Sequence, residues 1–499
     1  MRSGYSPTLI RGYNQARHLD PDPILARGRD ELKRLPIVTP LSFSSLPLSR
    51  AILDNLDNLG YQAMTPIQAQ GLPLIVEGRD LIAQAKTGSG KTAAFGLGIV
   101  HSLNVALSST QALVLCPTRE LAEQVANELR RLARALGNTK IITLCGGTPI
   151  RPQVESLKFG AHIIVATPGR LMDHIDRNTV DLSRIKTLVL DEADRMLDMG
   201  FYDDVNHIVN ACPAQRQTLL FSATYADDIR KASARFLKKP AEVKVESVHD
   251  ASHIEQFFYE IEADRRLAVV GQLLEHFRPV STLAFCNTKA QCRELVKYLE
   301  SRGFSALSLH GDLEQRERED VLVQFSNRSC SVLVATDVAA RGLDIQTLDA
   351  VINVDVTPDP EVHIHRIGRS GRGGAKGLAL SLCSPDEMRW ATQIEKYQNQ
   401  PLVWVNPKTL KPAPGGRLNP PMITLCVQGG KKDKLRPGDL LGALTKDAGF
   451  AADQIGKINI LEFVSFVALD RHIAKDAYDK LSNGNIKGRR FRMRFMSEI

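Results

Sequence analysis

The chain has 499 residues, of which 43% are hydrophobic and 24% charged, and a net charge of +8 that leaves room for a polyanionic partner. No apolar run approaches the roughly eighteen residues needed to span a bilayer, and we expect neither a secretory signal nor a membrane segment. The eight cysteines stand singly and never form a C-x-x-C pair, which indicates the reduced thiols of a cytoplasmic protein rather than disulfides or a zinc site.

Residues 1–40 are rich in charges and prolines, and we expect a flexible N-terminal extension without an assigned role. From about residue 50 to 240, short runs rich in Val, Ile and Leu alternate with longer amphipathic stretches. Each run is too apolar for a strand with one face in water, so the alternation predicts βαβ units that build a parallel sheet covered by helices on both faces. The runs are LIAQA (81–85), ALVLCP (112–117), IITLCGG (141–147), HIIVATP (162–168), TLVLDEAD (187–194) and TLLFSAT (218–224).

The same alternation begins again near residue 255, which predicts a second sheet of the same class and therefore two lobes with a cleft between them. We place the first lobe at 41–245 and the second at 246–400, because the pattern lapses in FLKKPAEVKVESVHDAS (236–252). Residues 401–421 are rich in Pro, Gly and Lys, which is the composition of a linker.

A small unit follows at 422–499, with predicted strands and helices in the order β-α-β-β-α-β. It contains 14 basic and 9 acidic residues, so it holds +5 of the net charge of +8. In RRFRMRF (489–495) three arginines alternate with apolar residues, and in a strand they would share one face. Such a face is either a solvated edge guarded by charge or a basic binding surface. The neighbouring KKDKLRPG loop favours the binding surface.

The stretch AKTGSGKT (85–92) follows a predicted strand and opens a predicted helix, which is the setting of a phosphate-binding loop. Its glycines allow backbone N–H groups to surround a phosphate. In this pattern Lys91 reaches the β- and γ-phosphates, and the Thr92 hydroxyl binds Mg²⁺. Ala85 stands where the G-x-x-x-x-G-K-[ST] pattern has its first glycine.

A second unusual stretch is TLVLDEAD, in which an apolar run ends in three carboxylates, Asp191, Glu192 and Asp194. Acids at a strand end commonly cap the helix that follows. The phosphate loop supplies a functional explanation, in which Asp191 holds Mg²⁺ through water and Glu192 polarises the attacking water.

These stretches belong to a longer ordered set that resembles the DEAD-box RNA helicases. The resemblance covers about residues 41–385. It implies an α/β fold with two tandem RecA-like lobes, and an RNA-dependent ATPase that unwinds short RNA duplexes locally. The motifs are AKTGSGKT (85–92), PTREL (117–121), TPGR (167–170), DEAD (191–194), SAT (222–224), FCNT (285–288), Q-x-x-R (315–318), ATDVAARGLD (335–344) and HRIGRSGR (365–372).

The resemblance assigns a nucleotide site with ATP and Mg²⁺ bound in the cleft. Gln68 would hydrogen-bond the adenine edge, which favours ATP over GTP, and Phe43, which lies 17 residues before Gly60, would stack on the base. The implied nucleotide contacts are Phe43, Gln68, Thr87, Gly88, Ser89, Gly90, Lys91, Thr92 and Asp344, with Thr92 and Asp191 at the metal. The implied catalytic and coupling residues are Lys91, Asp191, Glu192, Ser222 and Thr224, together with Arg369 and Arg372 as arginine fingers.

The resemblance also implies a track for one RNA strand, which contacts the sugar-phosphate backbone and carries little sequence information. A plain turn remains the alternative for the paired glycines 146 and 147. The implied contacts are Pro117, Thr118, Arg119, Gly146, Gly147, Thr167, Pro168, Gly169, Arg170, Arg318 and Thr336.

The last unit resembles the C-terminal RNA-binding domain of the bacterial DbpA-like helicases, in TLCVQGGKKDKLRPGDLLGALT (424–445), IGKI (455–458) and NGNIKGRRFRMRF (483–495). The resemblance implies a monomer that docks a hairpin of 23S ribosomal RNA in pre-large-subunit particles during ribosome assembly. The last unit lacks the aromatic-rich stacking motif of typical RNA-recognition strands. Its Phe463 and Phe466 face either RNA or the core, and the sequence leaves both alternatives open. The implied RNA contacts are Lys431, Lys432, Arg490, Arg492 and Arg494.

Two other functions fit the same motifs. An ATP-gated RNA clamp would use the same closed state and hold RNA as an assembly platform, with slow ATP hydrolysis. A DNA helicase would show ATP hydrolysis stimulated equally by DNA, whereas contacts to the 2′-OH would restrict it to RNA.

Overall fold

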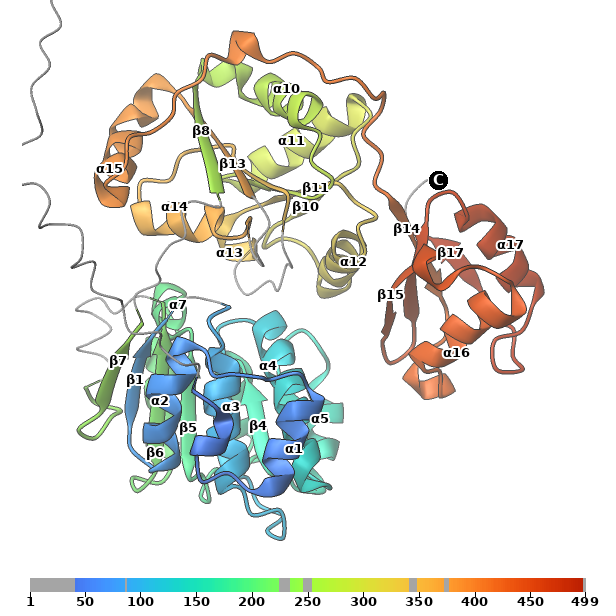
Figure 1. The fold of residues 1–499 in the computed structure, drawn as a ribbon. Coiled ribbons are helices and arrows are strands. Elements are labelled where there is room, and N and C mark those ends of the chain that lie inside the picture. The colour runs from blue at the N-terminus through green and yellow to red at the C-terminus, as the bar shows by residue number, and fades with distance from the viewer. Residues whose placement is uncertain are drawn as a thin grey trace, which may run out of the picture.

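A computed structural model describes residues 41–85, 88–223, 234–245, 254–340, 348–371 and 377–496. Two parallel-sheet lobes of the RecA type are followed by a small unit with an antiparallel sheet, which confirms the predicted fold (Figure 1). Within these residues no helix is both long and apolar enough to cross a membrane.

The first lobe contains a seven-stranded sheet in the order β3-β4-β2-β5-β6-β1-β7, and each of its strand pairs is parallel. The strands are β1 (Leu81–Gln84), β2 (Ala112–Leu115), β3 (Ile141–Leu144), β4 (Ile163–Ala166), β5 (Thr187–Asp191), β6 (Gln217–Ser222) and β7 (Ala241–Lys244). The helices are α1 (Arg50–Asn58), α2 (Pro66–Val76), α3 (Lys91–Ser102), α4 (Arg119–Leu132), α5 (Ile150–Lys158), α6 (Pro168–Asp176), α7 (Ala193–Asp198) and α8 (Tyr202–Ala211).

Alternate residues of the central strands enter two different hydrophobic clusters, one on each face of this sheet. Val114 and Val189 belong to one cluster, whereas Leu113 and Leu188 belong to the other. Both faces are therefore buried under helices, which is why the strands are continuously apolar in sequence. The edge strand β7 lies in the stretch where the periodic pattern lapses, and no strand was expected there.

The second lobe contains a six-stranded parallel sheet in the order β10-β11-β9-β12-β13-β8. The strands are β8 (Ile254–Glu260), β9 (Thr282–Phe285), β10 (Ala306–Leu309), β11 (Val332–Ala335), β12 (Ala350–Asn353) and β13 (Gly377–Cys383). The helices are α10 (Arg266–Phe277), α11 (Lys289–Ser301), α12 (Gln315–Ser326), α13 (Asp337–Ala340), α14 (Pro360–Ile367) and α15 (Met388–Gln398).

The predicted linker lies along the second lobe. The backbone of Phe258 exchanges two hydrogen bonds with Val403 and Val405, each 2.8 Å long. Further along, Arg278 Nη1 donates to the Gly416 carbonyl at 2.8 Å. This stretch therefore acts as a docked strap that leads to the third unit, although its composition is that of a linker.

The third unit, which we call the tail, has the strand order β15-β16-β14-β17 with antiparallel pairs, which confirms the predicted β-α-β-β-α-β arrangement. One face of the sheet packs on both helices through a single hydrophobic cluster. The last strand is shorter than expected and leaves Arg490 and Arg492 before it. The elements are β14 (Met422–Val427), α16 (Pro437–Gly442), β15 (Ile455–Ile460), β16 (Ser465–Asp470), α17 (Ala474–Asn483) and β17 (Met493–Phe495).

On the opposite face of the tail sheet, the central strands β14 and β16 are also buried and lobe 2 contacts them, whereas Lys457 on β15 and Arg494 on β17 are exposed. Thr424 on β14 accepts a hydrogen bond from Asn327 Nδ2 at 3.1 Å, and its hydroxyl lies 2.5 Å from that of Ser329. Cys426 and Phe466 form a register pair on this face, and both are buried outside the tail's own hydrophobic cluster. This is the side that RNA-recognition folds commonly offer to bases, and lobe 2 covers its centre.

His363 on α14 makes the stability of lobe 2 sensitive to acid. Its side chain is fully buried against the Phe258 ring, with centroids 5.7 Å apart, and neither ring nitrogen has a hydrogen-bond partner within the described part of the chain. Burial, followed by the charge of Arg366, lowers the pKa of His363 from 6.5 to about 3. The folded state therefore needs a neutral imidazole, so stability is complete above about pH 6.5 and is lost as the pH falls toward 3.

We expect the free energy of unfolding of lobe 2 to fall by about 2 kcal/mol more between pH 7.5 and pH 5 in the wild type than in His363→Leu. Urea titration at the two pH values measures the difference. A His472→Gln variant, which changes an exposed histidine, should keep the wild-type dependence. The same pH dependence in wild type and His363→Leu would contradict the assignment.

Candidate functional site

The predicted nucleotide residues meet at the carboxyl edge of the first sheet. Strand β6 lies between β5 and β1, with Asp191 in register with Phe221 and Gln84 in register with Ser222. The phosphate loop follows β1, and the DEAD acids follow β5. The parallel topology therefore places the end of the loop strand, the acids and the SAT serine on neighbouring strands.

The described part of the phosphate loop needs glycine at its turn into α3. Gly90 is the N-cap of α3 and has φ 93°, a left-handed conformation that favours glycine. A Cβ atom there would lie 2.6 Å from Gln68 Nε2. Gln68 is buried, donates from Nε2 to the Gly90 carbonyl at 3.1 Å, and accepts from the Thr65 N–H at 2.9 Å. The predicted adenine-binding glutamine is thus connected directly to the loop. Gly88 also has a positive φ of 85°, whereas Thr87 lies outside the described residues.

Two side chains of opposite charge are buried at this edge of the sheet, and each has a polar atom without a hydrogen-bond partner among the described residues. Lys91 is 6% exposed and Asp191 is 2% exposed, and neither Lys91 Nζ nor Asp191 Oδ1 has a hydrogen-bond partner within the described residues. A buried ionic group without partners costs several kcal/mol, so the pair fits a site completed by a ligand. Burial raises the pKa of Asp191 to about 7 against the opposing effect of the Lys91 ammonium, and a bound divalent cation would favour the ionised form. The residues present therefore fit a phosphate with its metal ion.

Glu192 is held in an unusual backbone conformation at the turn from β5 into α7. It has φ 53° and ψ 52°, and its side chain is buried. Its Oε2 accepts a hydrogen bond from Arg195 Nη1 at 2.8 Å. Non-glycine residues held in this region are strained by about 1 to 3 kcal/mol and cluster at functional sites.

The SAT segment is connected to the DEAD acids through its backbone. The Ala223 N–H donates to Asp194 Oδ2 at 3.1 Å, while Ser222 is buried at the end of β6. The link that we expected from the hydroxyl groups of Ser222 and Thr224 stays a prediction, and Thr224 lies outside the described residues. The alanine between them makes a backbone contact to the same acids.

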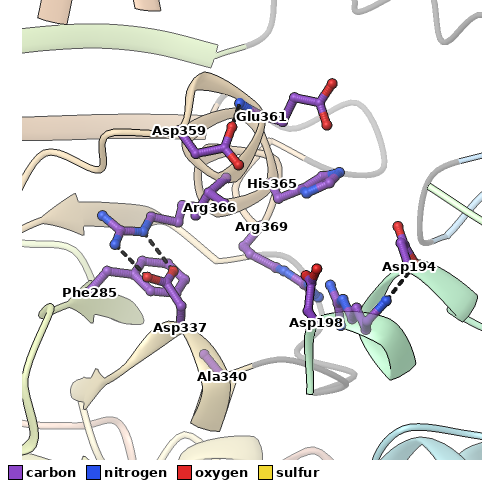
Figure 2. Close-up of a pocket in the computed structure, with 12 residues that line it drawn as sticks. Asp194, Asp198, Phe285, Asp337, Ala340, Asp359, Glu361, His365, Arg366 and Arg369 are labelled. Atoms are coloured by element: carbon purple, nitrogen blue, oxygen red, sulfur yellow. Dashed lines mark hydrogen bonds and ion pairs between the residues drawn. The ribbon is translucent and has the colours of Figure 1, made fainter. Parts of the chain in front are cut away.

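Arg369 of lobe 2 lies across the cleft from α7, the helix that begins within the DEAD motif. A cavity of about 250 Å³ between the lobes is lined by Asp194, Arg195 and Asp198 from α7 and by His365 and Arg369 from lobe 2 (Figure 2). Arginine fingers act on a transferred phosphoryl group only when two parts of a protein come together in this way. The predicted partner arginine, Arg372, and the predicted ribose contact, Asp344, lie outside the described residues.

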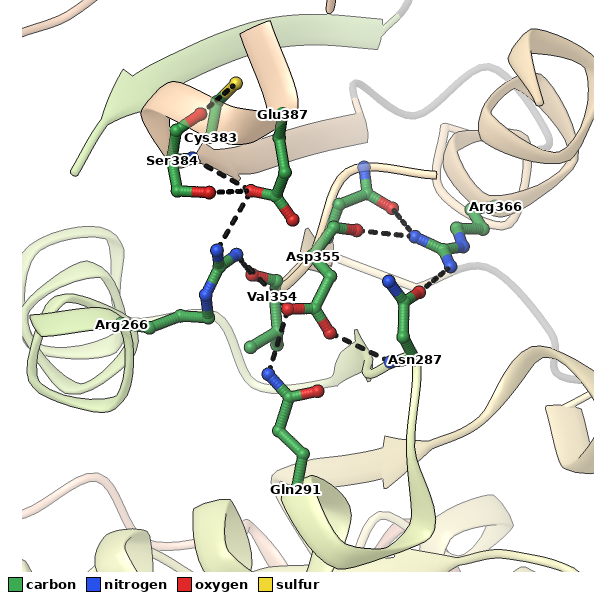
Figure 3. A network of polar contacts seen from close by, with 10 residues as sticks. Arg266, Asn287, Gln291, Val354, Asp355, Arg366, Cys383, Ser384 and Glu387 are labelled. Atoms are coloured by element: carbon green, nitrogen blue, oxygen red, sulfur yellow. Dashed lines mark hydrogen bonds and ion pairs between the residues drawn. The ribbon is translucent and has the colours of Figure 1, made fainter. Parts of the chain in front are cut away.

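Arg366 is fixed beside this cavity by a buried network. It donates from Nε and Nη2 to the two carboxylate oxygens of Asp337, at 2.8 and 2.6 Å, and from Nη1 to the Asp355 carbonyl at 2.8 Å. The Asp355 carboxylate contacts Arg266 at 3.2 Å and accepts from the Asn287 N–H at 2.8 Å (Figure 3). The network therefore joins the FCNT, ATD and HRIGR motifs into one rigid unit.

Sequence reasoning missed Arg266, Gln291, Asp355 and Glu387 in this network. Gln291 Nε2 donates to Asp355 Oδ1 at 2.9 Å, and Arg266 Nη2 donates to Glu387 Oε2 at 2.9 Å. These two pairs are separated by 64 and 121 residues in the sequence, so a single sequence does not show that their side chains meet. The one available signal is that charged residues stand beside apolar strands.

Phe43 occupies a buried position in a hydrophobic cluster on lobe 1. Its ring meets Tyr61 edge to face, with centroids 6.1 Å apart, and packs with Leu46 and Ile52. Stacking of Phe43 on adenine stays a prediction.

The predicted RNA track contains a guanidinium group with an unused donor. Arg119 packs on the paired glycines, and Gly147 has φ 71°, a left-handed conformation that favours glycine. Arg119 Nη1 is buried without a hydrogen-bond partner among the described residues, whereas Arg170 forms an ion pair with Asp173 and donates to the Thr148 carbonyl at 3.0 Å. Buried donors of this kind suit the oxygen atoms of a phosphate backbone.

Both track motifs of lobe 1 begin helices. Thr118 caps α4 by accepting from the Leu121 N–H at 3.3 Å, which leaves Pro117 just before the helix. Thr167 is the N-cap of α6, which opens with Pro168 and Gly169. Helix starts present free backbone N–H groups, which favours contacts with phosphates.

Arg318 joins the two lobes. Its Nε forms an ion pair with Glu120 of the PTREL motif, and its Nη2 donates to the Ala339 carbonyl at 2.8 Å. The second predicted RNA contact of lobe 2, Thr336, follows β11 and donates its N–H to the Leu309 carbonyl at 3.4 Å. Thr336 thus lies at the carboxyl end of β11, and Arg318 lies in the first turn of α12, the helix that follows β10.

The predicted RNA-binding residues of the tail, Lys431, Lys432, Arg490, Arg492 and Arg494, are all exposed. Arg494 pairs in register with Cys426, on the face turned toward lobe 2, and its charge lowers the pKa of Asp320 on α12 against the raising effect of burial. Arg494 is therefore exposed like the other two arginines and also lies close enough to lobe 2 for its charge to act on Asp320.

Three protein families match consecutive parts of the chain: the DEAD/DEAH box helicase family at 65–232, the helicase conserved C-terminal domain at 265–374, and the DbpA RNA binding domain at 424–495. The ATP-dependent RNA helicase DbpA of Escherichia coli (strain K12) is 51% identical over 456 residues, which are 91% of this chain and 99% of the relative. The DEAD-box ATP-dependent RNA helicase CshA of Geobacillus kaustophilus is 42% identical and covers 75% of this chain and 80% of its own.

Among solved structures, S. cerevisiae Dbp5 bound to RNA and ADP BeF3 is 31% identical, with a TM-score of 0.67 over 73% of this chain and 96% of its own. The ordered motifs, the two RecA-like lobes and the tail domain agree with these matches. The chain therefore belongs to the DEAD-box ATP-dependent RNA helicases and, within them, to the bacterial DbpA-like group.

Proposed function

We propose that the enzyme hydrolyses ATP with Mg²⁺ when RNA closes its two lobes, and that its tail directs this activity to a hairpin of 23S ribosomal RNA. The pair of buried, unsatisfied charges at Lys91 and Asp191 supports the nucleotide site most strongly, because Asp191 ends β5 and Lys91 opens the helix that follows β1 at the same edge of the sheet. The fixed contact between the tail and lobe 2 supports the targeting.

Each residue at the cleft has a role that its chemistry allows. Lys91 would bind the β- and γ-phosphates, and Thr92 with Asp191 would hold the metal. Mg²⁺, when bound, neutralises charge that develops on the phosphates. Glu192 would orient and polarise the attacking water, and Arg369 would stabilise the phosphoryl group from lobe 2.

RNA would control hydrolysis by favouring the closed arrangement of the lobes. Arg119 and Arg170 on lobe 1, and Arg318 and Thr336 on lobe 2, would hold one backbone across the cleft. An arginine finger on lobe 2 stabilises the phosphoryl group only while the lobes are together, so RNA binding and ATP hydrolysis become coupled.

The tail would supply the RNA specificity that a backbone-reading core lacks. Its excess of positive charge favours RNA, and the exposed Lys431, Lys432, Arg490, Arg492 and Arg494 would contact a folded hairpin. We infer that a cytoplasmic monomer acts in this way on pre-large-subunit particles during ribosome assembly.

A double variant Lys431→Gln/Lys432→Gln should bind a 23S ribosomal hairpin more weakly and with a flatter salt dependence. Each lost phosphate contact lowers the slope of log K against log salt concentration by about 0.7 to 0.9, so two contacts lower it by about 1.5. Fluorescence titration from low to moderate salt measures the slope.

The matched control is Lys446→Gln/Lys475→Gln, which removes the same charge from exposed tail positions outside the basic loop. It should leave the slope close to that of the wild type. If both doubles lower the slope equally, the tail attracts RNA through net charge alone and the proposed docking site is wrong.

A further inference from the structure

The tail has an aromatic side chain exposed at the tip of its β15–β16 hairpin. Phe463 is 66% exposed, whereas Phe466, three residues later, is 2% exposed on the sheet face that lobe 2 covers. The Leu461 N–H donates to the Val464 carbonyl at 2.8 Å, which closes a tight turn with Phe463 at its apex. Turn apices usually hold Gly, Asn or Asp, so an exposed phenylalanine there suggests a binding role.

The predicted basic loop packs directly on this turn. The backbone N–H groups of Lys431 and Lys432 donate to the carbonyls of Leu461 and Glu462, at 2.9 and 3.0 Å. A Cβ atom on Gly430 would lie 2.5 Å from the Leu461 carbonyl oxygen, so the two segments are in close contact. An exposed aromatic ring and two exposed ammonium groups therefore lie on one small, rigid surface, which we call the hairpin-tip site (Lys431, Lys432, Glu462 and Phe463).

The chemistry of this site matches unpaired nucleotides. A base stacks on an aromatic face, while lysines bind the adjoining phosphates. The centre of the sheet face that would otherwise offer such a platform is buried, with Thr424 bonded to Asn327 and Ser329 and Phe466 only 2% exposed. Among the large hydrophobic side chains of the described tail, only Leu441 and Phe463 are exposed by more than about a third.

We propose that Phe463 is the base-stacking residue of the tail, and that it binds an unpaired base in the loop of the RNA hairpin. This inference rests on the proposed function, because it assumes that the tail docks a hairpin. It adds the kind of nucleotide that is recognised, since stacking requires a base that is not paired in a helix.

Substitutions of Phe463 distinguish base stacking, which requires an aromatic ring, from hydrophobic contact, which leucine can also make. We expect Phe463→Ala and Phe463→Leu both to weaken binding of a 23S ribosomal hairpin by roughly 5- to 150-fold, and Phe463→Tyr to stay within about threefold of the wild type. The slope of affinity against salt should not change in any of these variants, because no phosphate contact is lost. Since Phe463 is exposed, the thermal unfolding temperature should also be unchanged.

A hairpin with 2-aminopurine at one loop position at a time gives a direct readout. Fluorescence should be quenched at one position by the wild type and Phe463→Tyr, and not by Phe463→Leu. If Phe463→Leu binds as tightly as the wild type, or quenches equally, the stacking assignment is overturned.

The lysine double variant distinguishes two negative results: that Phe463 does not stack on a base, and that the tail does not dock the hairpin. If Lys431→Gln/Lys432→Gln lowers the salt slope while Phe463→Leu binds normally, the hairpin is docked without stacking, and only the inference on Phe463 falls. If neither change affects binding, the tail does not dock the hairpin through this site, and both the inference and the proposed docking are wrong.

Discussion

Replacing Glu192 with glutamine should slow RNA-stimulated ATP hydrolysis by a factor on the order of 10² to 10⁴ while ATP binding changes by less than about threefold. The amide has the same shape as the carboxylate and can still accept the hydrogen bond from Arg195, which lies 2.8 Å away in the wild type. It cannot polarise a water molecule. The loss should therefore appear in the chemical step and not in ground-state binding.

The closed state should accumulate as a consequence. A chain that binds ATP and RNA but does not hydrolyse ATP cannot reopen by losing the γ-phosphate, so its complex with ATP and RNA should dissociate more slowly than that of the wild type. Single-turnover hydrolysis and RNA dissociation rates measure the two effects.

A matched control is Asp203→Asn, which removes one carboxylate from an exposed position on the nearby helix α8. It should hydrolyse ATP at the wild-type rate. Near-normal turnover in Glu192→Gln would remove Glu192 from its assigned role and leave the water to be oriented by another group.

The sequence predicted the architecture of both lobes because their strands are buried on both sides. Runs such as ALVLCP alternate between two hydrophobic clusters, so they lack polar positions and stand out from the amphipathic helices. The short edge strand β7 was missed because AEVK is half polar, with only Val243 buried. An edge strand forms because it pairs with a neighbouring strand, here β1, and its own sequence need not show a strand pattern.

The site was predictable where motif and topology coincide. The phosphate loop and the DEAD acids both follow strands of one parallel sheet, and the carboxyl ends of such strands meet at one edge. Contacts that depend on distant partners could not be predicted. Examples are the ion pair of Glu120 with Arg318, which joins positions 198 residues apart, and the bond from Gln68 to the Gly90 carbonyl.

The position of the tail was the largest gap. Its strand order follows from local patterns, but the burial of Thr424 and Phe466 on the outer face depends on lobe 2. The residues of the central tail strands are apolar or small on both faces of the sheet. This pattern indicates that both faces are covered, but it does not show which part of the protein covers the outer face. The covered centre of the sheet is one reason why we propose the hairpin tip as the base-binding surface of the tail.

Removing the tail should produce the second large effect. In a chain that ends at Pro412, the concentration of 23S ribosomal RNA fragment that gives half-maximal ATP hydrolysis should rise by about 10²- to 10⁴-fold. The tail and the core bind the same RNA molecule, so the tail raises the effective concentration of substrate at the core. At saturating RNA the maximal rate should remain within an order of magnitude of the full chain, because the residues of the cleft are intact.

The central claim is that a tail selects the RNA for a core that reads only the backbone. The most direct test is steady-state ATP hydrolysis by the full chain and by the chain ending at Pro412, each with 23S ribosomal RNA fragment, with an unrelated structured RNA, and without RNA. We predict strong stimulation of the full chain by the ribosomal fragment at low concentration, and weak, equal stimulation of the shortened chain by both RNAs. Equal stimulation of the full chain by both RNAs would contradict the claim.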